Sequence, residues 1–442
     1  MICDKQRKLY TARVEQFTNR LGKKVLSASV EFEATFGHSV EPVYFDKRLD
    51  LEYKAIKEGE TWGAAWESAW FSLTGIVPEA WAGKAVVAQL NFNSEGLVFS
   101  DEGLPLQGIT DGSVFDGGYG RDLFPLYDNA AGGEAVSLWV ETAANSLFGI
   151  KRVSDPPRDC PNRHGSYAGT VNTIRLATFE PELYQFWLDL SVLFDLYSAL
   201  PETSTRAIRI LGGLSKVVER FADDTNNASA CREMLRPLLE QKAHASAITA
   251  TAIGHAHIDT GWLWPVRETI RKSARTFASQ LDLIEKYPGY VFGASQPAHY
   301  AMVKKHYPAL YEKIKAAVKT GAWELQGGMW VEADCNVPSG ESLVRQFIHG
   351  KNFFKDEFDV DVKNLWIPDV FGYSASLPQM MKRSGVDYFL TQKLSWSQFN
   401  KFPHTTFMWR GIDGTSVLTH FPPENNYNSM LDPKGMIDAE EN

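Results

Sequence analysis

The sequence predicts a multidomain protein that combines an all-β part with an α/β part. Three patterns follow one another along the 442 residues: short alternating strands, then helical spacing, then alternating strands and helices. A chain of this length exceeds one ordinary hydrophobic core, so separate domains are expected. We expect a β-sandwich with a leading segment at 1–180, a helical connector at 181–245 and an α/β domain at 246–442.

Period-two alternation of apolar residues indicates the strands of the first domain. It runs through residues 69–77 and 136–141, and Gly- and Asp-rich breaks occur at 111–112 and 116–118. Short strands divided by such turns are typical of an all-β sandwich.

Trp62, Trp66 and Trp70 are an exception, because their spacing of four is helical. Since the alternation is clear just beyond them, we expect the first long strand to begin at about residue 66.

Helical spacing predicts the connector. Leu188, Val192, Leu196 and Leu200 recur every fourth residue, with Leu193 beside them, as the apolar stripe of an amphipathic helix does. A second stripe predicts a helix over 208–221, and the polar run at 223–227 predicts the loop that follows it.

Strand and helix patterns alternate in the last domain, which predicts a mostly parallel sheet or barrel. An apolar run at 247–253 predicts a buried strand that reaches Asp259, and Pro265 marks the start of the next helix. Gly321 is expected to end a helix that begins at Pro308. The remaining predicted elements are strands at 290–294, from 323, at 365–369 and at 388–391, helices at 343–358 and 377–384, and a hairpin that joins 407–409 to 417–419 through Asp413-Gly414.

Composition excludes some classes of protein. The 45 basic and 54 acidic residues give a net charge of -9, which argues against nucleic acid or an anionic membrane as partner. No apolar run approaches the ~20 residues of a membrane span, and the N-terminus lacks the apolar segment of a signal peptide. The four cysteines are scattered without a C-x-x-C pair, at positions Cys3, Cys160, Cys231 and Cys335. We therefore expect free thiols and a cytoplasmic protein.

The segment 254–262 holds the most informative residues. If the strand continues through it, His257 and Asp259 point to the same face at the strand's C-terminal end. Ligands bind at such ends in α/β folds, and a nitrogen with an oxygen suits a divalent metal such as zinc. The motif is short and common, so a capped loop with a solvated Asp is the alternative.

Two further strand ends carry polar side chains, at 327–334 and 366–373. Asp369, in the second of them, could complete a metal site with His257 and Asp259 and leave positions open for substrate. A turn before Gly372 is the alternative role for Asp369. Asp334, in the first, is interpreted either as the N-terminal cap of the next helix or as a substrate contact.

These stretches together resemble glycoside hydrolase family 38, the α-mannosidases, and most nearly their cytosolic and vacuolar branch. Strands before residue 110 resemble the β-sandwich of that branch, and the likeness extends from about 40 to 425. The motifs that carry the resemblance are GHAHIDTGWLWP (254–265), GGMWVEADCNVPSGES (327–342), LWIPDVFGYSASLPQ (365–379) and LTQKLSWSQFNKFPHTTFMWRG (390–411).

The resemblance implies a metal-dependent retaining α-mannosidase that acts on mannose-containing oligosaccharides. It implies zinc, or cobalt in some members of the branch, held by His257, Asp259 and Asp369. Asp369 is also the implied nucleophile, which forms a covalent glycosyl-enzyme. Trp262 is implied to pack under the sugar. We expect Asp334 and Tyr373 as further substrate contacts, and His255 either as a neighbour that supports the metal ligands or as a structural residue. Members of the family often form dimers or tetramers.

Family members continue for several hundred residues beyond this point and carry the acid/base and a fourth metal ligand there. We therefore expect an incomplete (β/α) barrel-like catalytic domain in a fragment that lacks the acid/base. Two other functions stay open at this stage. One is a metal-dependent carbohydrate deacetylase, because one His and two Asp also suit hydroxide attack on an acetyl group. The other is an inactive sugar-binding fragment.

Overall fold

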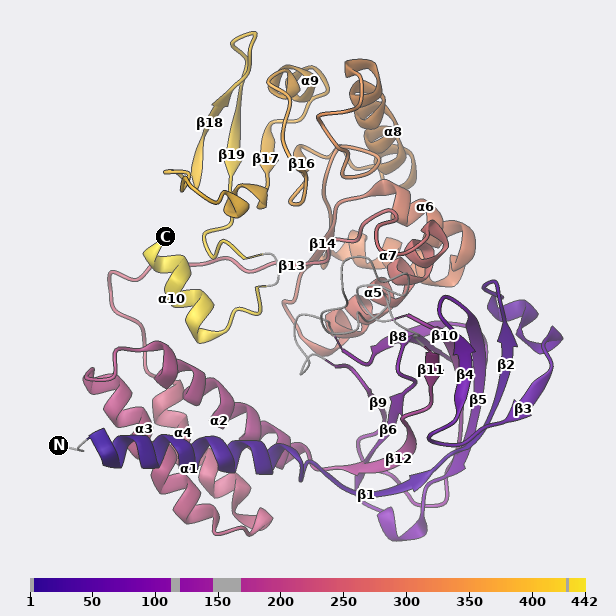
Figure 1. Ribbon diagram of the computed structural model, residues 1–442, viewed down its shortest axis with the longest axis vertical. Coiled ribbons are helices and arrows are strands. Elements are labelled where there is room, and N and C mark those ends of the chain that lie inside the picture. Colours follow the sequence, from indigo (N-terminus) through magenta and orange to yellow (C-terminus); the bar gives the residue numbers. More distant parts are fainter. Residues whose placement is uncertain (1–3, 113–119, 146–167, 427–428) are drawn as a thin grey trace, which may run out of the picture.

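The computed structural model describes residues 4–112, 120–145, 168–426 and 429–442 in three bodies (Figure 1). A β-sandwich, a helical bundle and an α/β unit follow the order expected from the sequence. The predicted break at 116–118 lies outside the described residues, as do Cys3 and Cys160. Cys231 and Cys335 are free thiols, as predicted. Every helix among the described residues is too short or too polar to span a lipid bilayer.

Two antiparallel sheets form the sandwich. The inner faces pack Phe71 and Val140 of one sheet with Val86 and Leu176 of the other. The first sheet has the order β1 (Leu26–Glu31), β12 (Thr173–Phe179), β6 (Ala85–Asn91), β9 (Leu123–Tyr127). The second has the order β3 (Tyr53–Ala55), β2 (Glu33–Ser39), β5 (Ser68–Ile76), β10 (Ala135–Ala143), β7 (Glu95–Phe99), β8 (Pro105–Thr110), and β4 (Thr61–Ala64) pairs separately with β11 (Ala168–Thr170).

The tryptophans at helical spacing belong to two strands and the turn between them. Trp62 lies on β4 and Trp70 on β5, while Trp66 adopts a positive φ of 71° in the turn. The long strand begins at Ser68, two residues after the expected start. Trp70 packs outside the sandwich core, in the cluster that contains Phe277 of the α/β unit.

The helical bundle contains an element that the sequence analysis placed elsewhere. α1 (Asp4–Gly22) was expected to lead into the sandwich, but its Phe17 ring packs 5.2 Å from Phe221. The reason is an apolar stripe, Val14, Phe17 and Leu21, that only another helical surface covers. The other helices of the bundle are α2 (Pro181–Ala199), α3 (Thr205–Phe221), α4 (Ala228–Leu239) and α10 (Pro433–Glu441).

The predicted stripe on α2 was right in part. Leu193 is buried as expected, but Val192 is exposed, and the other buried positions include Phe186 and Leu190. α2 is apolar on most of its surface, so spacing alone does not select the buried face.

The α/β unit contains two small sheets. β13 (Gly254–His255), β14 (Phe292–Ala294) and β15 (Trp323–Leu325) pair in parallel. In the second sheet β16 (Asn364–Trp366), β17 (Tyr388–Leu390) and β19 (Ser416–His420) are parallel, and β18 (Thr406–Arg410) closes the predicted hairpin with β19. The helices are α5 (Val266–Lys286), α6 (Pro297–His306), α7 (Pro308–Thr320), α8 (Gly340–Phe358) and α9 (Leu377–Arg383). α7 ends at Gly321 in the left-handed conformation, as predicted.

The strand predicted over 247–259 was wrong in extent. Only Gly254 and His255 pair with β14, and residues 247–253 are irregular and exposed, with Ile248 at 54%. β13 lies at the edge of its sheet and has one partner strand, so the apolar run before it gains no sheet hydrogen bonds. His257 and Asp259 consequently lie in the loop after β13.

Helix α5 joins the α/β unit to the sandwich through buried charges. Glu95 of β7 pairs with Lys272 and, at 2.8 Å, with Arg275. Nearby, Arg271 pairs with Glu268 on the same helix, and both side chains are buried. The backbones also approach closely, because a Cβ on Gly108 of β8 would lie 2.9 Å from the Arg275 carbonyl oxygen. The sandwich and the α/β unit therefore share one docked interface.

Removal of the Glu95 carboxylate should destabilise this interface. Glu95→Ala takes a shared anion from two buried cations, which should lower the free energy of unfolding by about 3–5 kcal/mol. Urea denaturation followed by circular dichroism measures the change. Glu233→Ala, which breaks an exposed pair with Arg236, is the control and should cost under about 1 kcal/mol. Equal losses in the two variants would contradict the assigned role of Glu95.

Candidate metal centre

The loop after β13 and the turn after β16 bring three predicted side chains together. His257 Nε2 lies 3.4 Å from Asp259 Oδ1 and 3.6 Å from Asp369 Oδ2. One ligand-type atom from each residue lies within 4.8 Å of the others, and all three side chains are partly exposed. They thus form one cluster that is open to solvent.

The loop keeps its shape without a strand because α5 holds it. Thr269 Oγ1, on a buried face of α5, donates to the Asp259 carbonyl oxygen at 3.0 Å. The same hydroxyl accepts hydrogen bonds from Gly261 N and Trp264 Nε1, each at 3.0 Å. One side chain therefore fixes the backbone on both sides of the turn that follows Asp259.

Glu332 faces the other edge of the His257 ring. Its Oε2 lies 2.5 Å from His257 Nδ1, and its side chain is 3% exposed. From this segment Asp334 was predicted as a site residue, and Glu332 was not. The signal was present, since Glu332 also follows β15 at a strand end.

Lys393 is a second residue that the sequence analysis missed. Its ammonium group pairs with Asp369 Oδ1 and lies 3.7 Å from the centroid of the Phe371 ring and 3.6 Å from that of Trp396. Lys393 follows β17, so the same strand-end argument would have included it. The two oxygens of Asp369 thus face different partners, Oδ1 toward Lys393 and Oδ2 toward His257.

The charges of this cluster favour a cation. Burial by itself lowers the pKa of His257, but the carboxylates of Glu332 and Asp259 outweigh it and hold that pKa well above its ordinary value. Burial raises the pKa of Glu332, whereas the facing His257 brings it below its ordinary value. If His257 is neutral, the cluster has a formal charge of minus two. The negative charges are the carboxylates of Asp259, Glu332 and Asp369, and the positive charge is the Lys393 ammonium group. A divalent cation would balance this charge.

The donor atoms also fit a divalent metal. His257 Nε2 is buried and makes no hydrogen bond, although two carboxylates lie beside it. One imidazole nitrogen and two carboxylate oxygens are a donor set that zinc accepts, with further positions left for other ligands. The residues present therefore fit the metal that the sequence suggested.

The other predicted contact residues lie in different surroundings. Trp262 is 51% exposed, on the loop that carries His257. The Tyr373 hydroxyl donates to the Ile367 carbonyl oxygen at 3.2 Å and contacts Thr391, so the protein framework engages it.

Asp334 is not a helix cap. Its carboxylate accepts hydrogen bonds from Asn336 N and Val337 N at 3.2 and 2.9 Å and so closes a turn. Ser339 caps α8 instead, through a hydrogen bond from Ser342 N. Ser339 directly precedes the first helical residue, and Asp334 lies too far before it.

His255 is held by the framework on both ring nitrogens. Nδ1 lies 2.9 Å from the Gly293 carbonyl oxygen, and Trp366 Nε1 donates to Nε2 at 3.2 Å. This pattern requires the neutral form, in agreement with burial, which lowers the pKa of His255. Both nitrogens are occupied, which fits the structural role expected for this residue.

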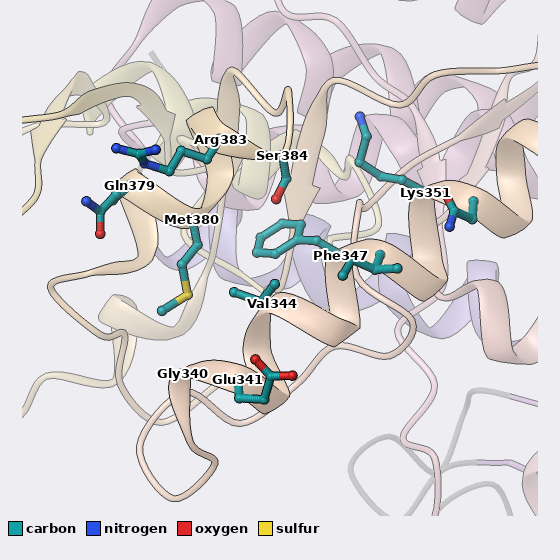
Figure 2. A pocket seen from close by; sticks show the side chains of 11 residues that line it. Gly340, Glu341, Val344, Phe347, Lys351, Gln379, Met380, Arg383 and Ser384 are labelled. Atoms are coloured by element: carbon teal, nitrogen blue, oxygen red, sulfur yellow. The ribbon is translucent and has the colours of Figure 1, made fainter.

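An open groove of about 710 Å³ lies between α8 and α9 (Figure 2). Phe347, Met380 and Arg383 are among the side chains that line it. None of the three clustered side chains, His257, Asp259 and Asp369, lines this groove. The candidate site is therefore defined by the converging ligands and not by this cavity.

Comparisons with known proteins find matches for the sandwich and for the α/β unit. Residues 247–442 match the N-terminal domain of glycosyl hydrolases family 38, and residues 28–180 match the jelly roll domain of α-mannosidase. The class of protein is therefore a glycosyl hydrolase in which a jelly-roll domain precedes the hydrolase domain. The chain belongs to glycosyl hydrolase family 38.

Three relatives cover most of this chain. It is 37% identical over 428 residues to α-mannosidase G of Dictyostelium discoideum, which covers 96% of this chain and 38% of that protein. It is 35% identical over 391 residues to α-mannosidase 2C1 of Homo sapiens, with 88% and 36% covered. It is 34% identical over 404 residues to α-mannosidase of Saccharomyces cerevisiae, with 86% and 36% covered. The chain thus spans 38% or less of the length of these relatives.

The hydroxyl of Thr269 can be tested as the support of the ligand loop. Thr269→Val keeps the shape but leaves buried groups of the loop without a partner, which should lower the free energy of unfolding by about 1–3 kcal/mol. Urea denaturation gives this value, and hydrogen exchange should show faster exchange at 259–264. Thr269→Ser retains the hydroxyl and is the control. Unchanged exchange in Thr269→Val would show that the loop is held by other contacts.

Proposed function

We propose that the complete protein is a metal-dependent retaining α-mannosidase that removes terminal α-mannosyl residues from oligosaccharides. The convergence of His257, Asp259 and Asp369 within 4.8 Å supports this most directly. Relatives named as α-mannosidases along most of the chain support the substrate class. The activity is assigned to the complete protein because this chain matches 38% or less of each relative.

We propose zinc as the metal, with cobalt as the alternative, held by His257 through Nε2 and by the carboxylates of Asp259 and Asp369. When bound, such an ion supplies a Lewis acid for the hydroxyl groups of a sugar. Asp259 and Asp369 are partly exposed, so a substrate can reach the same face of the cluster.

Asp369 is proposed as the nucleophile. Its carboxylate oxygen would bond to the anomeric carbon while the bond from that carbon to the leaving oxygen breaks. A second carboxyl group of the complete protein would protonate the leaving oxygen, and water would then release mannose with its configuration retained. Lys393 holds Oδ1 of Asp369 and so fixes the rotation of the carboxylate for this attack.

Trp262 is proposed as the surface on which the sugar ring packs. Its indole is half exposed and lies on the loop that carries His257 and Asp259. Asp334 and Tyr373 are weaker candidates for substrate contacts, because turn and framework hydrogen bonds already engage their side chains.

Zinc binding tests the ligand set without any need for turnover. The metal-free chain should bind a single zinc ion, and His257→Ala should weaken that binding by at least about 100-fold, since it removes the only nitrogen ligand of the set. Competition with a chromophoric chelator measures the affinity. His404→Ala is the control, because this histidine is exposed. Equal affinity of the two variants would exclude His257 as a ligand.

Turnover tests the nucleophile. In the complete protein, Asp369→Ala should lower kcat for an aryl α-mannoside by about 10⁴-fold or more, because the covalent intermediate cannot form. Mass spectrometry after reaction with a slowly released fluorinated mannosyl donor should find the label on Asp369. Survival of hydrolysis in the variant would contradict the assignment. Release of acetate from an acetylated sugar, without release of mannose, would favour a deacetylase.

A further inference from the structure

The two ring nitrogens of His257 face different surroundings. Nε2 points to Asp259 and Asp369, at 3.4 and 3.6 Å, while Nδ1 points to Glu332, at 2.5 Å. Both atoms are buried, and neither makes a hydrogen bond of full geometry among the described residues, so the ion-pair contact at 2.5 Å is the polar interaction that joins them. The Glu332 carboxylate is therefore the polar neighbour of His257 Nδ1, and the imidazole is the polar neighbour of Glu332 Oε2.

Glu332 is fixed in place from the strand between the two loops. Ser295, directly after β14, donates a hydrogen bond to Glu332 Oε1 at 2.5 Å. Gln296 accepts one from Glu332 N at 3.2 Å and donates one to the Ile258 carbonyl oxygen at 2.8 Å. Gln296 thus ties the loop of Glu332 to the loop of His257, while Ser295 holds the Glu332 carboxylate itself.

The position of Glu332 distinguishes it from a metal ligand. Its Oε2 lies against the nitrogen that faces away from the two aspartates. The group of ligand-type atoms that lie within 4.8 Å of one another contains His257, Asp259 and Asp369, and it does not include Glu332. A carboxylate on the far nitrogen of a ligand histidine instead fixes the ring and its tautomer.

We propose that Glu332 is the positioning residue of this metal centre. Its carboxylate accepts the Nδ1 proton of His257, so the lone pair of Nε2 points toward Asp259 and Asp369. The proton stays on Nδ1, and Glu332 keeps its negative charge. This inference rests on the proposed metal site and adds a residue to it that does not touch the metal.

Zinc affinity of the metal-free full chain tests the proposal. Glu332→Ala should weaken zinc binding by about 10–100-fold, the usual loss when the outer partner of a ligand histidine is removed. Glu332→Gln should lose less, because its amide oxygen still accepts the Nδ1 proton. Glu324→Gln removes the same charge from the exposed side of β15 and should bind zinc as the wild type does. Wild-type affinity in Glu332→Ala would overturn the proposal.

Two further measurements separate positioning from coordination and from loss of fold. At saturating Co²⁺, the visible spectrum of Glu332→Gln should keep the band positions of the wild type, since the ligands are the same. Shifted bands would show that Glu332 coordinates the ion and would overturn its positioning role. Ser295→Ala leaves Glu332 in the chain but frees its carboxylate, and it should weaken zinc binding about 3–10-fold, a part of the full loss. If neither Ser295→Ala nor Glu332→Ala changes the zinc affinity, the proposal is wrong.

The outcomes for the proposed function and for this inference differ. If the wild-type chain binds no zinc, the proposed metal site itself fails. If the wild type binds zinc and Glu332→Ala binds it equally well, the metal site stands and the role of Glu332 fails.

Discussion

Convergence of like charges is the constraint on which the site depends. Asp259, Asp369 and Glu332 all approach the ring of one histidine, within 2.5 to 3.6 Å. Carboxylates held this close are unfavourable unless positive charge lies among them, and burial strengthens the effect. In the protein alone the imidazolium of His257 can supply that charge, and a divalent ion can replace it. The network around the ring therefore requires positive charge at its centre, which is the property that a cation site shares.

A single helix connects this site to the rest of the molecule. One end of α5 fixes the ligand loop through Thr269, and its next turns dock on the sandwich through Arg271, Lys272 and Arg275. Because the same rigid element serves both contacts, the sandwich acts as a support for the ligand loop. Buried ion pairs add little net stability to the folded protein. Other docking arrangements would leave a buried cation without its carboxylate, so the pairs favour the arrangement observed.

Local signals in the sequence were sufficient for elements whose ends have a chemical marker. Pro308 and Gly321 delimit α7, and Asp413-Gly414 forms the hairpin turn, because their backbone preferences act without the rest of the fold. The expectation that polar groups gather at strand ends brought His257, Asp259 and Asp369 together correctly. These features depend on a few neighbouring residues.

Features that depend on tertiary partners were not predicted. The apolar run 247–253 has strand propensity but no neighbouring strand, and α1 packs on helices that begin about 160 residues later. Glu332 and Lys393 escaped notice because a single acid or base near a strand end is common, and only the folded chain shows which one meets a ligand.

The most direct measurement of the central claim is anomalous diffraction from crystals of this chain grown with zinc, with data on both sides of the zinc absorption edge. One strong peak is expected about 2.0–2.2 Å from His257 Nε2 and from carboxylate oxygens of Asp259 and Asp369. A peak bound elsewhere, with these three side chains turned away from one another, would contradict it.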